Sequence, residues 1–190
     1  GVRWYLESRA ERSARDFYAA EQLFKRDQWD AARDAFANLA KSLGSSPYGR
    51  LAALYAGHAS LRADHPGEAS TFYKTFLDQT PAGDPSRQLA EVGLARALEA
   101  SGDLDGARQH YTMADREGPA RSDAVLSLAR MEAKGNKEKA IDLYLRYLKD
   151  FPDAPLRDVA RYEVEQLGGV PPPEAVPPAP NMNGVSLGGP

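Results

Sequence analysis

The side chains that most often perform chemistry are few in this sequence and lie far apart. Its 190 residues include three histidines, His58, His65 and His110, and no cysteine. None of these histidines has a second histidine four residues away, and no glycine-rich phosphate loop or Gly-x-Ser-x-Gly turn is present. Without cysteine there are no disulfide bonds, thiolate nucleophiles or cysteine zinc ligands. The sequence therefore predicts a protein that is not an enzyme and that uses no metal and no cofactor.

Carboxylates are plentiful, but their spacing indicates a solvated helix surface. Acidic and basic residues are interleaved near the start of the chain: Glu7, Arg9, Glu11, Arg12, Arg15, Asp16 and Glu21. Opposite charges three or four positions apart are neighbours on a helix and stabilise its exposed side. The net charge of −3 and the pI near 5.7 argue against nucleic acid as a partner, because phosphate binding usually requires a basic excess.

A regular pattern of packing residues dominates the chain instead. An alanine followed four positions later by an aromatic residue recurs every 33 to 38 residues, as Ala32/Phe36, Ala69/Tyr73, Ala107/Tyr111 and Ala140/Tyr144. The alanine lets two helices approach closely, and the ring fills space one turn later on the same face. A proline follows each motif and is expected to stop the second helix of its unit: Pro47, Pro81, Pro119 and Pro152. A period of this length predicts repeated pairs of helices.

Apolar periodicity predicts where these helices lie. Four pairs are expected at about 8–26 and 30–43, 48–63 and 66–79, 86–100 and 103–116, and 121–134 and 137–150. Gly44 should end the second helix, and Pro66 suits the first turn of the fourth. A last amphipathic helix at about 155–167 should cap the stack. We expect a helical domain at 8–168, a lead-in at 1–7 and a flexible Pro/Gly-rich tail at 169–190.

Between residues 13 and 152 the pattern resembles the tetratricopeptide repeat family. The third repeat fits its motif best, with Ala95, Gly102, Ala107, Tyr111, Ala114 and Pro119, and the second is similar, with Gly57, Ala69, Tyr73, Phe76 and Pro81. Pro47 lies three residues late, and Leu128 occupies a position where the family has a small residue. The resemblance implies an all-α fold, a right-handed α-solenoid of about four helix pairs with a C-terminal capping helix.

The resemblance also implies a concave groove lined by the first helix of each pair, which would bind a protein or peptide partner. The family's groove positions correspond here to Phe17, Glu21, Phe24, Leu54, His58, Leu61, Arg62, Val92, Arg96 and Glu99. Leu54 and Val92 stand where relatives that clamp a terminal carboxylate begin their polar cluster, so carboxylate clamping is disfavoured. Two alternatives stay open: burial of Leu54, Leu61 and Val92 between repeats, and a structural role for His58.

The two ends of the chain bear on location. Trp4 and Tyr5 beside Arg3 are typical of residues that follow a membrane span, and equally of an amphipathic lead-in that packs on the first helix. Residues 170–190 hold seven of the fourteen prolines and little apolar bulk, which predicts a flexible or polyproline-like extension. We therefore expect a periplasmic protein anchored in the inner membrane by a removed segment, with a cytoplasmic location as the alternative.

A narrower resemblance covers residues 3–55. The helix around Phe17 and the stretch Ser-Pro-Tyr-Gly-Arg-Leu-Ala-Ala-Leu that follows Ser45 are similar to the periplasmic, single-span ancillary subunits of the bacterial Sec translocon. This implies a non-enzymatic adaptor or chaperone-like scaffold of the cell envelope, with the Sec translocon or secreted chains as partners. Two alternatives remain: a self-associating structural repeat protein, and a factor of outer-membrane assembly or cell division.

Overall fold

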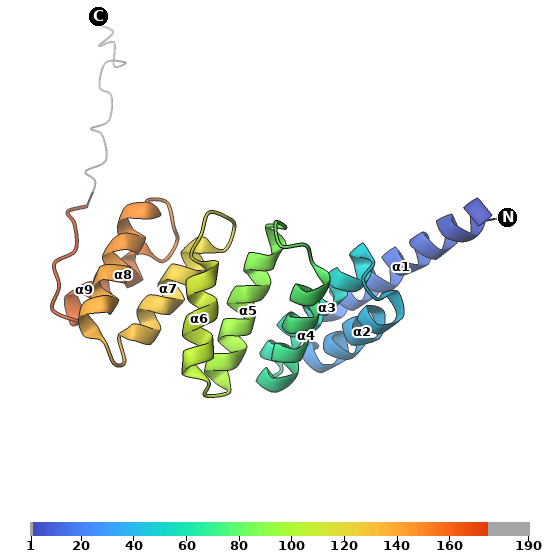
Figure 1. The fold of residues 1–190 in the computed structure, drawn as a ribbon, viewed down its shortest axis with the longest axis horizontal. Helices are drawn as coiled ribbons and strands as arrows, with labels where there is room; N and C mark the ends of the chain where they lie inside the picture. Colours follow the sequence, from blue (N-terminus) through green and yellow to red (C-terminus); the bar gives the residue numbers. More distant parts are fainter. Residues whose placement is uncertain (1, 175–190) are drawn as a thin grey trace, which may run out of the picture.

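The computed structural model describes residues 2–174, apart from the side chains of residues 3–9, and this part of the chain contains helices and turns but no strand. The helices are α1 (Val2–Lys25), α2 (Trp29–Leu43), α3 (Pro47–Arg62), α4 (Pro66–Gln79), α5 (Ser86–Ala100), α6 (Leu104–Ala114), α7 (Arg121–Glu132), α8 (Lys137–Asp150) and α9 (Arg157–Gln166). Figure 1 shows one elongated row with α1 and α9 at opposite ends. The all-α solenoid that the repeat pattern predicts is confirmed.

Four helix pairs form the four repeats. Helix α9 follows them, where the sequence predicts one last unpaired helix. In each pair we call the first helix A (α1, α3, α5, α7) and the second B (α2, α4, α6, α8). The bounds of α4, α5 and α8 are those expected from the sequence, and those of the other helices except α1 agree to within two residues. Helix α1 begins at Val2 rather than near residue 8. Residues 2–7, expected as a lead-in, therefore belong to the first helix.

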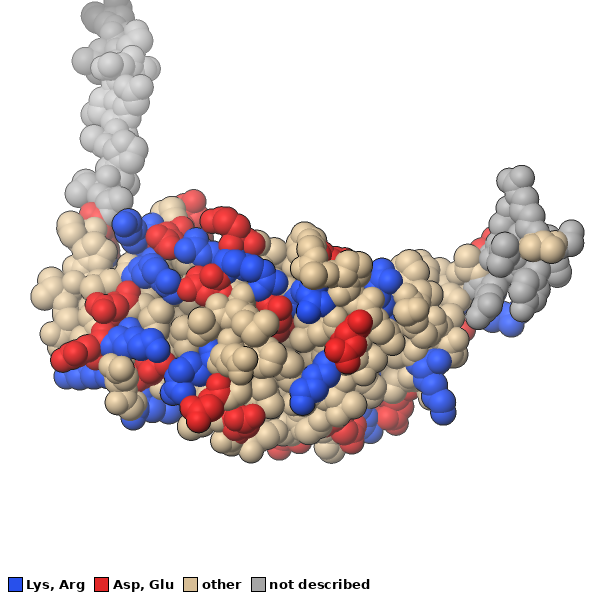
Figure 2. All heavy atoms as spheres, viewed as in Figure 1, with Lys and Arg blue, Asp and Glu red and all other residues tan. Residues whose placement is uncertain are grey.

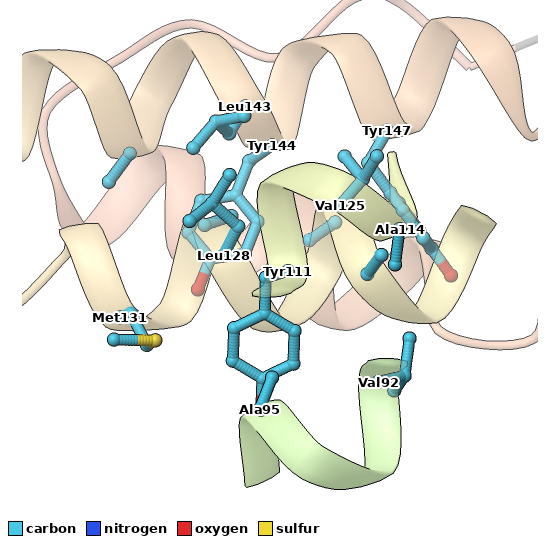
Figure 3. Packing of buried hydrophobic residues seen from close by; sticks show 14 of the residues in the cluster. Val92, Ala95, Tyr111, Ala114, Val125, Leu128, Met131, Leu143, Tyr144 and Tyr147 are labelled. Carbon is cyan, nitrogen blue, oxygen red and sulfur yellow. The ribbon is translucent and has the colours of Figure 1, made fainter. Parts of the chain in front are cut away.

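The repeated alanine and aromatic residues pack as predicted. All four alanines are fully buried, and the four aromatic side chains that follow them are at most 2% exposed. Tyr73 illustrates the close approach, because a Cβ atom on Gly57 would lie 2.8 Å from its ring and one on Gly93 would overlap it. In Figure 3 the ring of Tyr111 points at Ala95 of α5. Small residues on the A helices thus make room for the rings of the B helices.

Pro47 does not stop a helix, which corrects the expectation drawn from the repeat pattern. Helix α2 already ends at Leu43, where Gly44 takes a left-handed conformation with φ 53°. Pro47 is the first residue of α3, and the Ser46 hydroxyl accepts a hydrogen bond from the Gly49 amide at 3.1 Å. Proline fits the first turn of a helix because its missing N–H has no partner to lose there.

The turns between A and B helices use two different residues at the same left-handed position. Asp27 (φ 57°) and Asp64 (φ 61°) occupy it in the first two repeats, and Gly102 (φ 86°) in the third. In the third and fourth repeats a side chain caps the B helix: Asp103 accepts from the Gly106 amide and Asn136 from the Lys139 amide. These caps satisfy backbone donors that a helix start otherwise leaves free.

The ends of the chain are only partly described. The side chains of Trp4 and Tyr5, on which the anchor hypothesis rests, lie outside the described residues, as do residues 175–190 of the predicted tail. None of the described helices combines the length and the apolar character that crossing a bilayer requires. Residues 169–174 are described and contact α8 and α9.

Candidate interaction surface

The predicted groove residues all come from A helices, and these helices share one side of the molecule. Contacts between alternate helices join α1 to α3, α3 to α5 and α5 to α7. The B helices pack on the other side: α2, α4 and α6 each lie between two A helices, and α8 lies between α7 and α9. We call the side formed by α1, α3, α5, α7 and the terminal helix α9 the A-helix face.

In the first two repeats this face is built around aromatic rings. The ring of Phe17 lies 5.3 Å from Phe36 and 5.6 Å from Tyr55, and the ring of Phe24 lies 4.9 Å from Trp29. The exposed Arg62 guanidinium sits 4.6 Å above the Trp29 ring, within the range of a cation–π contact. We call the rings the aromatic cluster: Phe17, Phe24, Trp29, Phe36, Tyr48 and Tyr55. Of the predicted groove residues, the structure thus brings Phe17, Phe24 and Arg62 together.

Two predicted groove residues are core residues instead. Leu54 is 4% exposed and packs with Tyr73 and Phe76, and Val92 is 3% exposed and packs in the core of the last two repeats. Side chains so deeply buried can touch no partner, so the packing alternative holds for both. Leu61 is half-buried against the core around Tyr73.

Glu21 and His58 have partners within the chain. The Glu21 carboxylate forms an ion pair with Lys25 one turn later, at 3.1 Å. Nδ1 of His58 lies 2.7 Å from the Tyr73 hydroxyl, and its ring packs against the rings of Tyr55 and Tyr73. Burial, together with the nearby Arg96 guanidinium, lowers the pKa of His58 to about 4. The imidazole is therefore neutral at neutral pH, and its contacts favour the structural alternative.

In the last two repeats the A-helix face carries a hollow of about 270 Å³, which we call the α5–α7–α9 pocket. It is lined by Arg96, Asp123, Leu126, Ser127, Arg130, Tyr144, Leu156, Val159 and Glu163. The α7 residues are spaced three or four apart, as residues on one helix face must be. Leu156, the residue before α9, and Val159, in the first turn of α9, remain 43% and 48% exposed. The pocket thus has an accessible apolar wall and charged residues of both signs.

Ion pairs hold the charged residues around this pocket. Arg96 reaches across from α5 to Asp123 of α7 at 3.2 Å, and Arg130 reaches back to Glu99 at 2.9 Å. Glu99 also accepts a hydrogen bond from the Tyr111 hydroxyl at 3.1 Å. Arg96 and Arg130 border a second hollow of about 420 Å³, which also includes Lys134. Arg96 and Glu99, both predicted groove residues, therefore lie at the centre of a charged region.

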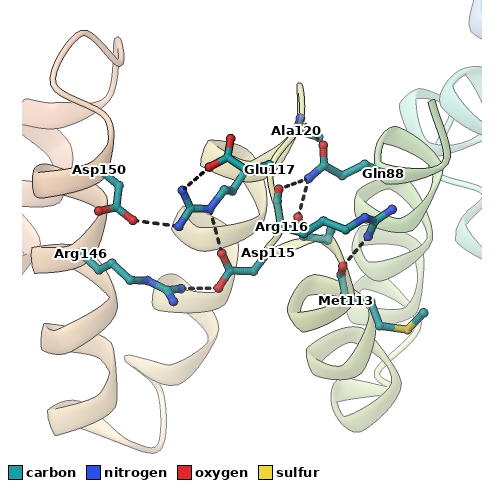
Figure 4. A network of polar contacts seen from close by, with 10 residues as sticks. Gln88, Met113, Asp115, Arg116, Glu117, Ala120, Arg146 and Asp150 are labelled. Carbon is teal, nitrogen blue, oxygen red and sulfur yellow. Dashed lines mark hydrogen bonds and ion pairs between the residues drawn. The ribbon is translucent and has the colours of Figure 1, made fainter. Parts of the chain in front are cut away.

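A network of polar contacts, with Gln88 buried at one side of it, connects α7 and α8 to α5 and so shapes the pocket. The Gln88 amide, 1% exposed, donates to the carbonyls of Ala114 and Arg116 and accepts from the Ala120 amide. Asp115 accepts from Arg146 at 2.5 Å and from Arg121 at 3.3 Å. Figure 4 shows these contacts converging on the loop between α6 and α7. These contacts connect the loop to α5, α7 and α8.

Comparison with known proteins agrees with this architecture. A family model described as "Tetratricopeptide repeat-like domain" matches residues 1–168. The chain belongs to this family. Two solved structures of nearly identical TPR-like repeats assigned to a kinesin light chain of Podosopora anserina, one a single-residue variant, are similar at 18% identity, with TM-scores of 0.68 and 0.67. They cover 82% of this chain, and 84% and 85% of theirs, and at this identity the likeness shows the fold alone. No curated protein sequence matches the chain.

Several residues of this tetratricopeptide repeat-like surface were not among the groove residues that the sequence predicted. Asp123, Leu126 and Arg130 come from the fourth repeat, where Leu128 departs from the family pattern, and the predicted groove residues all lie in the first three repeats. Their three- and four-residue spacing on α7 was the available signal. Trp29, Tyr48 and Tyr55 do not stand at the family's groove positions, so the resemblance does not predict them. Tyr48 and Tyr55, seven residues apart, share a helix face.

Tetratricopeptide repeat-like folds are typically non-enzymatic scaffolds. Within the described residues, no three side chains of the types His, Cys, Asp and Glu are grouped to hold a metal ion. The family match indicates no catalytic activity. In Figure 2 charged side chains crowd over the part of the view that α6 to α9 occupy, and the middle of the molecule is largely uncharged. Such a surface can bind another protein through apolar contacts and charge pairs.

Proposed function

We propose that this protein is a non-enzymatic scaffold that binds an extended segment or a helix of a partner protein on its A-helix face. Tetratricopeptide repeat-like folds are interaction scaffolds, and repeat stacks offer extended surfaces of this kind. The observation that carries the proposal is the α5–α7–α9 pocket, with exposed apolar side chains at one wall and an ion pair, Arg96 with Asp123, at another.

The pocket defines the chemistry of the segment it would take. Leu126, Leu156 and Val159 suit an apolar side chain, because burying it against them removes apolar surface from water. Arg96 and Arg130 suit an acidic residue beside it, and Asp123 and Glu163 a basic one. A mixed surface selects weakly for sequence, which fits an adaptor or a chaperone-like protein.

The cell-envelope role belongs to the proposal as well. Its support is the similarity of residues 3–55 to the ancillary subunits of the Sec translocon, which would make secreted chains the partners and the periplasm the location. Outer-membrane assembly or cell division is the alternative setting. The fold and the pocket are compatible with each of these.

The test compares client binding by variants of the exposed apolar wall. We expect the double variant Leu156→Ser and Val159→Ser to bind fluorescently labelled, reduced and carboxymethylated lactalbumin, a permanently unfolded client, about 5- to 30-fold more weakly than the parent. This corresponds to about 1–2 kcal/mol for two interface residues. Fluorescence anisotropy gives the affinities, and circular dichroism checks folding.

A matched control is Met113→Ser, because Met113 is 47% exposed but lies on a B helix, away from the pocket. It should bind the client like the parent. Equal affinity of parent and folded double variant would refute the pocket as the binding site. A parent that does not bind unfolded clients would contradict the chaperone-like form of the proposal.

A further inference from the structure

The first residues after α9 form a strap across the end of the stack. Residues 169–174, which we call the end strap, have no regular secondary structure, and Figure 1 shows them running along the end opposite α1. The Gly169 amide donates to the Val164 carbonyl at 2.8 Å, and Arg161 donates to the Pro172 carbonyl at 2.5 Å. Arg161 also lies 3.6 Å from the Glu174 carboxylate. The strap therefore turns back along α9.

The end strap covers apolar side chains of the last helices. A Cβ atom on Gly169 would lie 2.9 Å from Ile141 of α8 and from Val164 of α9, so the backbone is pressed against both. Further along, Val170, Pro172 and Pro173 lie with Leu145 and Leu148 around a shared hollow. In the interior of the stack, apolar side chains of this kind are covered by the next repeat, and the strap takes the place of that repeat.

The opposite end of the stack is hollowed, and the described residues that line the hollow belong to its own two helices. Between α1 and α2 lies a space of about 390 Å³, lined by Asp16, Ala19, Ala20, Leu23, Ala35, Asn38, Leu39 and Ser42. On each helix these residues are three or four apart over two turns, which makes a groove that runs along both. Its alanines leave room for bulkier side chains, such as the leucines and isoleucine under the strap.

We propose that the two ends of the stack bind each other between copies, and that the end strap prevents this association while it lies on α8 and α9. The occupant of the strap's surface is the α1–α2 end of a second copy. The argument is continuity: consecutive repeats within the chain bury the same kind of apolar surface on each other, from α2 against α3 to α8 against α9. A head-to-tail contact repeats from copy to copy and builds open chains of molecules.

The end strap is held weakly enough to leave. Val170 is 85% exposed, and the ion pair between Arg161 and Glu174 lies at the surface, where such pairs contribute little. Irregular segments with few buried contacts open locally at low cost in free energy. A partner that captures the proline-rich residues would therefore uncover the surface beneath.

The test uses the full chain and dislodges the end strap by substitution. Gly169→Val forces a side chain into Ile141 and Val164, and Arg161→Ala removes the anchor of Pro172 and Glu174. We expect the double variant to show a weight-average mass that rises with concentration in sedimentation equilibrium, while the parent and the control Glu165→Ala remain single chains. Adding Ala19→Arg, which fills the α1–α2 groove at an exposed position, should restore single chains.

Each other outcome counts against a stated part of the proposal. A folded double variant that stays a single chain refutes the covered association surface, and a parent that associates equally refutes the blocking role of the strap. Association that survives Ala19→Arg refutes the head-to-tail contact. If circular dichroism shows that the double variant loses helix, Arg161→Ala alone is judged by the same criteria. Client binding on the A-helix face is measured separately, so the two proposals can fail independently.

Discussion

The first two repeats and the last two have the same helical arrangement, but different side-chain contacts connect their helices. Among the described residues, every aromatic ring contact except that of Tyr147 with Phe151 lies between residues 17 and 73. The last two repeats share an apolar core and are joined in addition by charged pairs, such as Arg96 with Asp123 and Arg146 with Asp115. Both halves thus have an apolar core, to which the first adds contacts between aromatic rings and the second adds charged pairs between helices. The two halves should therefore respond differently to mutation and pH.

The largest effect is expected from opening the aromatic half. Phe36→Ala removes a fully buried ring that contacts Phe17 and Tyr55, and should lower the free energy of unfolding by about 3–5 kcal/mol. Urea denaturation followed by circular dichroism measures this loss. Tyr18→Ala, at an exposed position of the same half, should stay within about 0.5 kcal/mol of the parent. A loss below about 1 kcal/mol for Phe36→Ala would contradict the importance of the ring contacts.

In the polar half the comparable substitution is Gln88→Leu. It keeps most of the volume but leaves two carbonyls and the Ala120 amide without their partner, which should cost about 1–3 kcal/mol. Hydrogen exchange should also show faster exchange in the loop between α6 and α7, because this side chain ties the loop to α5. Gln166→Leu, on the exposed surface of α9, serves as the control and should be nearly neutral. Unchanged exchange would show that the loop is held by other contacts.

The aromatic half should lose stability with falling pH through His58. The pKa of His58 is about 4 in the folded protein against 6.5 when exposed, so the unfolded chain takes up a proton first. Stability is therefore full above about pH 6.5 and falls progressively down to about pH 4, by about 1–2 kcal/mol at pH 5. His58→Gln should flatten the curve of unfolding free energy between these values. A parallel curve for the variant would contradict the role of His58.

The polar half should respond at lower pH, through Glu132. Burial acts to raise the pKa of Glu132, but hydrogen bonds from Lys139 and Arg108 outweigh it and the net shift is downward from 4.5. Its contribution is thus present above about pH 4.5 and is lost as the pH falls through the lower pKa of the folded state. Glu132→Gln should reduce the acid dependence in that range and leave the range above pH 5 unchanged. An effect confined to the higher range would assign the titration to another group.

The smallest effect concerns the turns between A and B helices, where the halves also differ. Asp64 holds a left-handed conformation in the second repeat that Gly102 holds in the third. Asp64→Gly should relieve this strain and raise the free energy of unfolding by up to about 1 kcal/mol, reduced by the greater freedom of glycine in the unfolded chain. Thermal unfolding measures the gain. A clear loss of stability would show that the Asp64 side chain makes contacts worth more than the strain.

The fold could be predicted from the sequence because each repeat carries its own local pattern of apolar and small residues. The alanine and aromatic motifs set the packing of each pair, and the helices follow from apolar spacing. Pro47 was misjudged because a proline serves equally after a helix and at the first turn of the next one. Propensity alone does not distinguish these two uses.

The candidate surface was predicted less well, for a geometric reason. On an A helix, the side that faces the groove and the side that faces the next repeat are neighbouring sectors of one apolar stripe. Leu54 lies in the core and Tyr55 on the A-helix face, although they are adjacent in sequence. The contribution of α9 to the pocket depends on how the last helix docks, which no local pattern encodes.

Helices that contact each other are close together along the chain, and this favours folding during synthesis. Every pair of helices with extensive contact lies no more than two positions apart along the chain, as in α1 with α3. Helical proteins whose contacts are local fold in microseconds to milliseconds, whereas ribosomes add only about 5–20 residues per second. Each repeat can therefore fold while later ones are still being synthesised. The end strap follows α9 in the chain, so the apolar surface that it covers is synthesised before the strap itself.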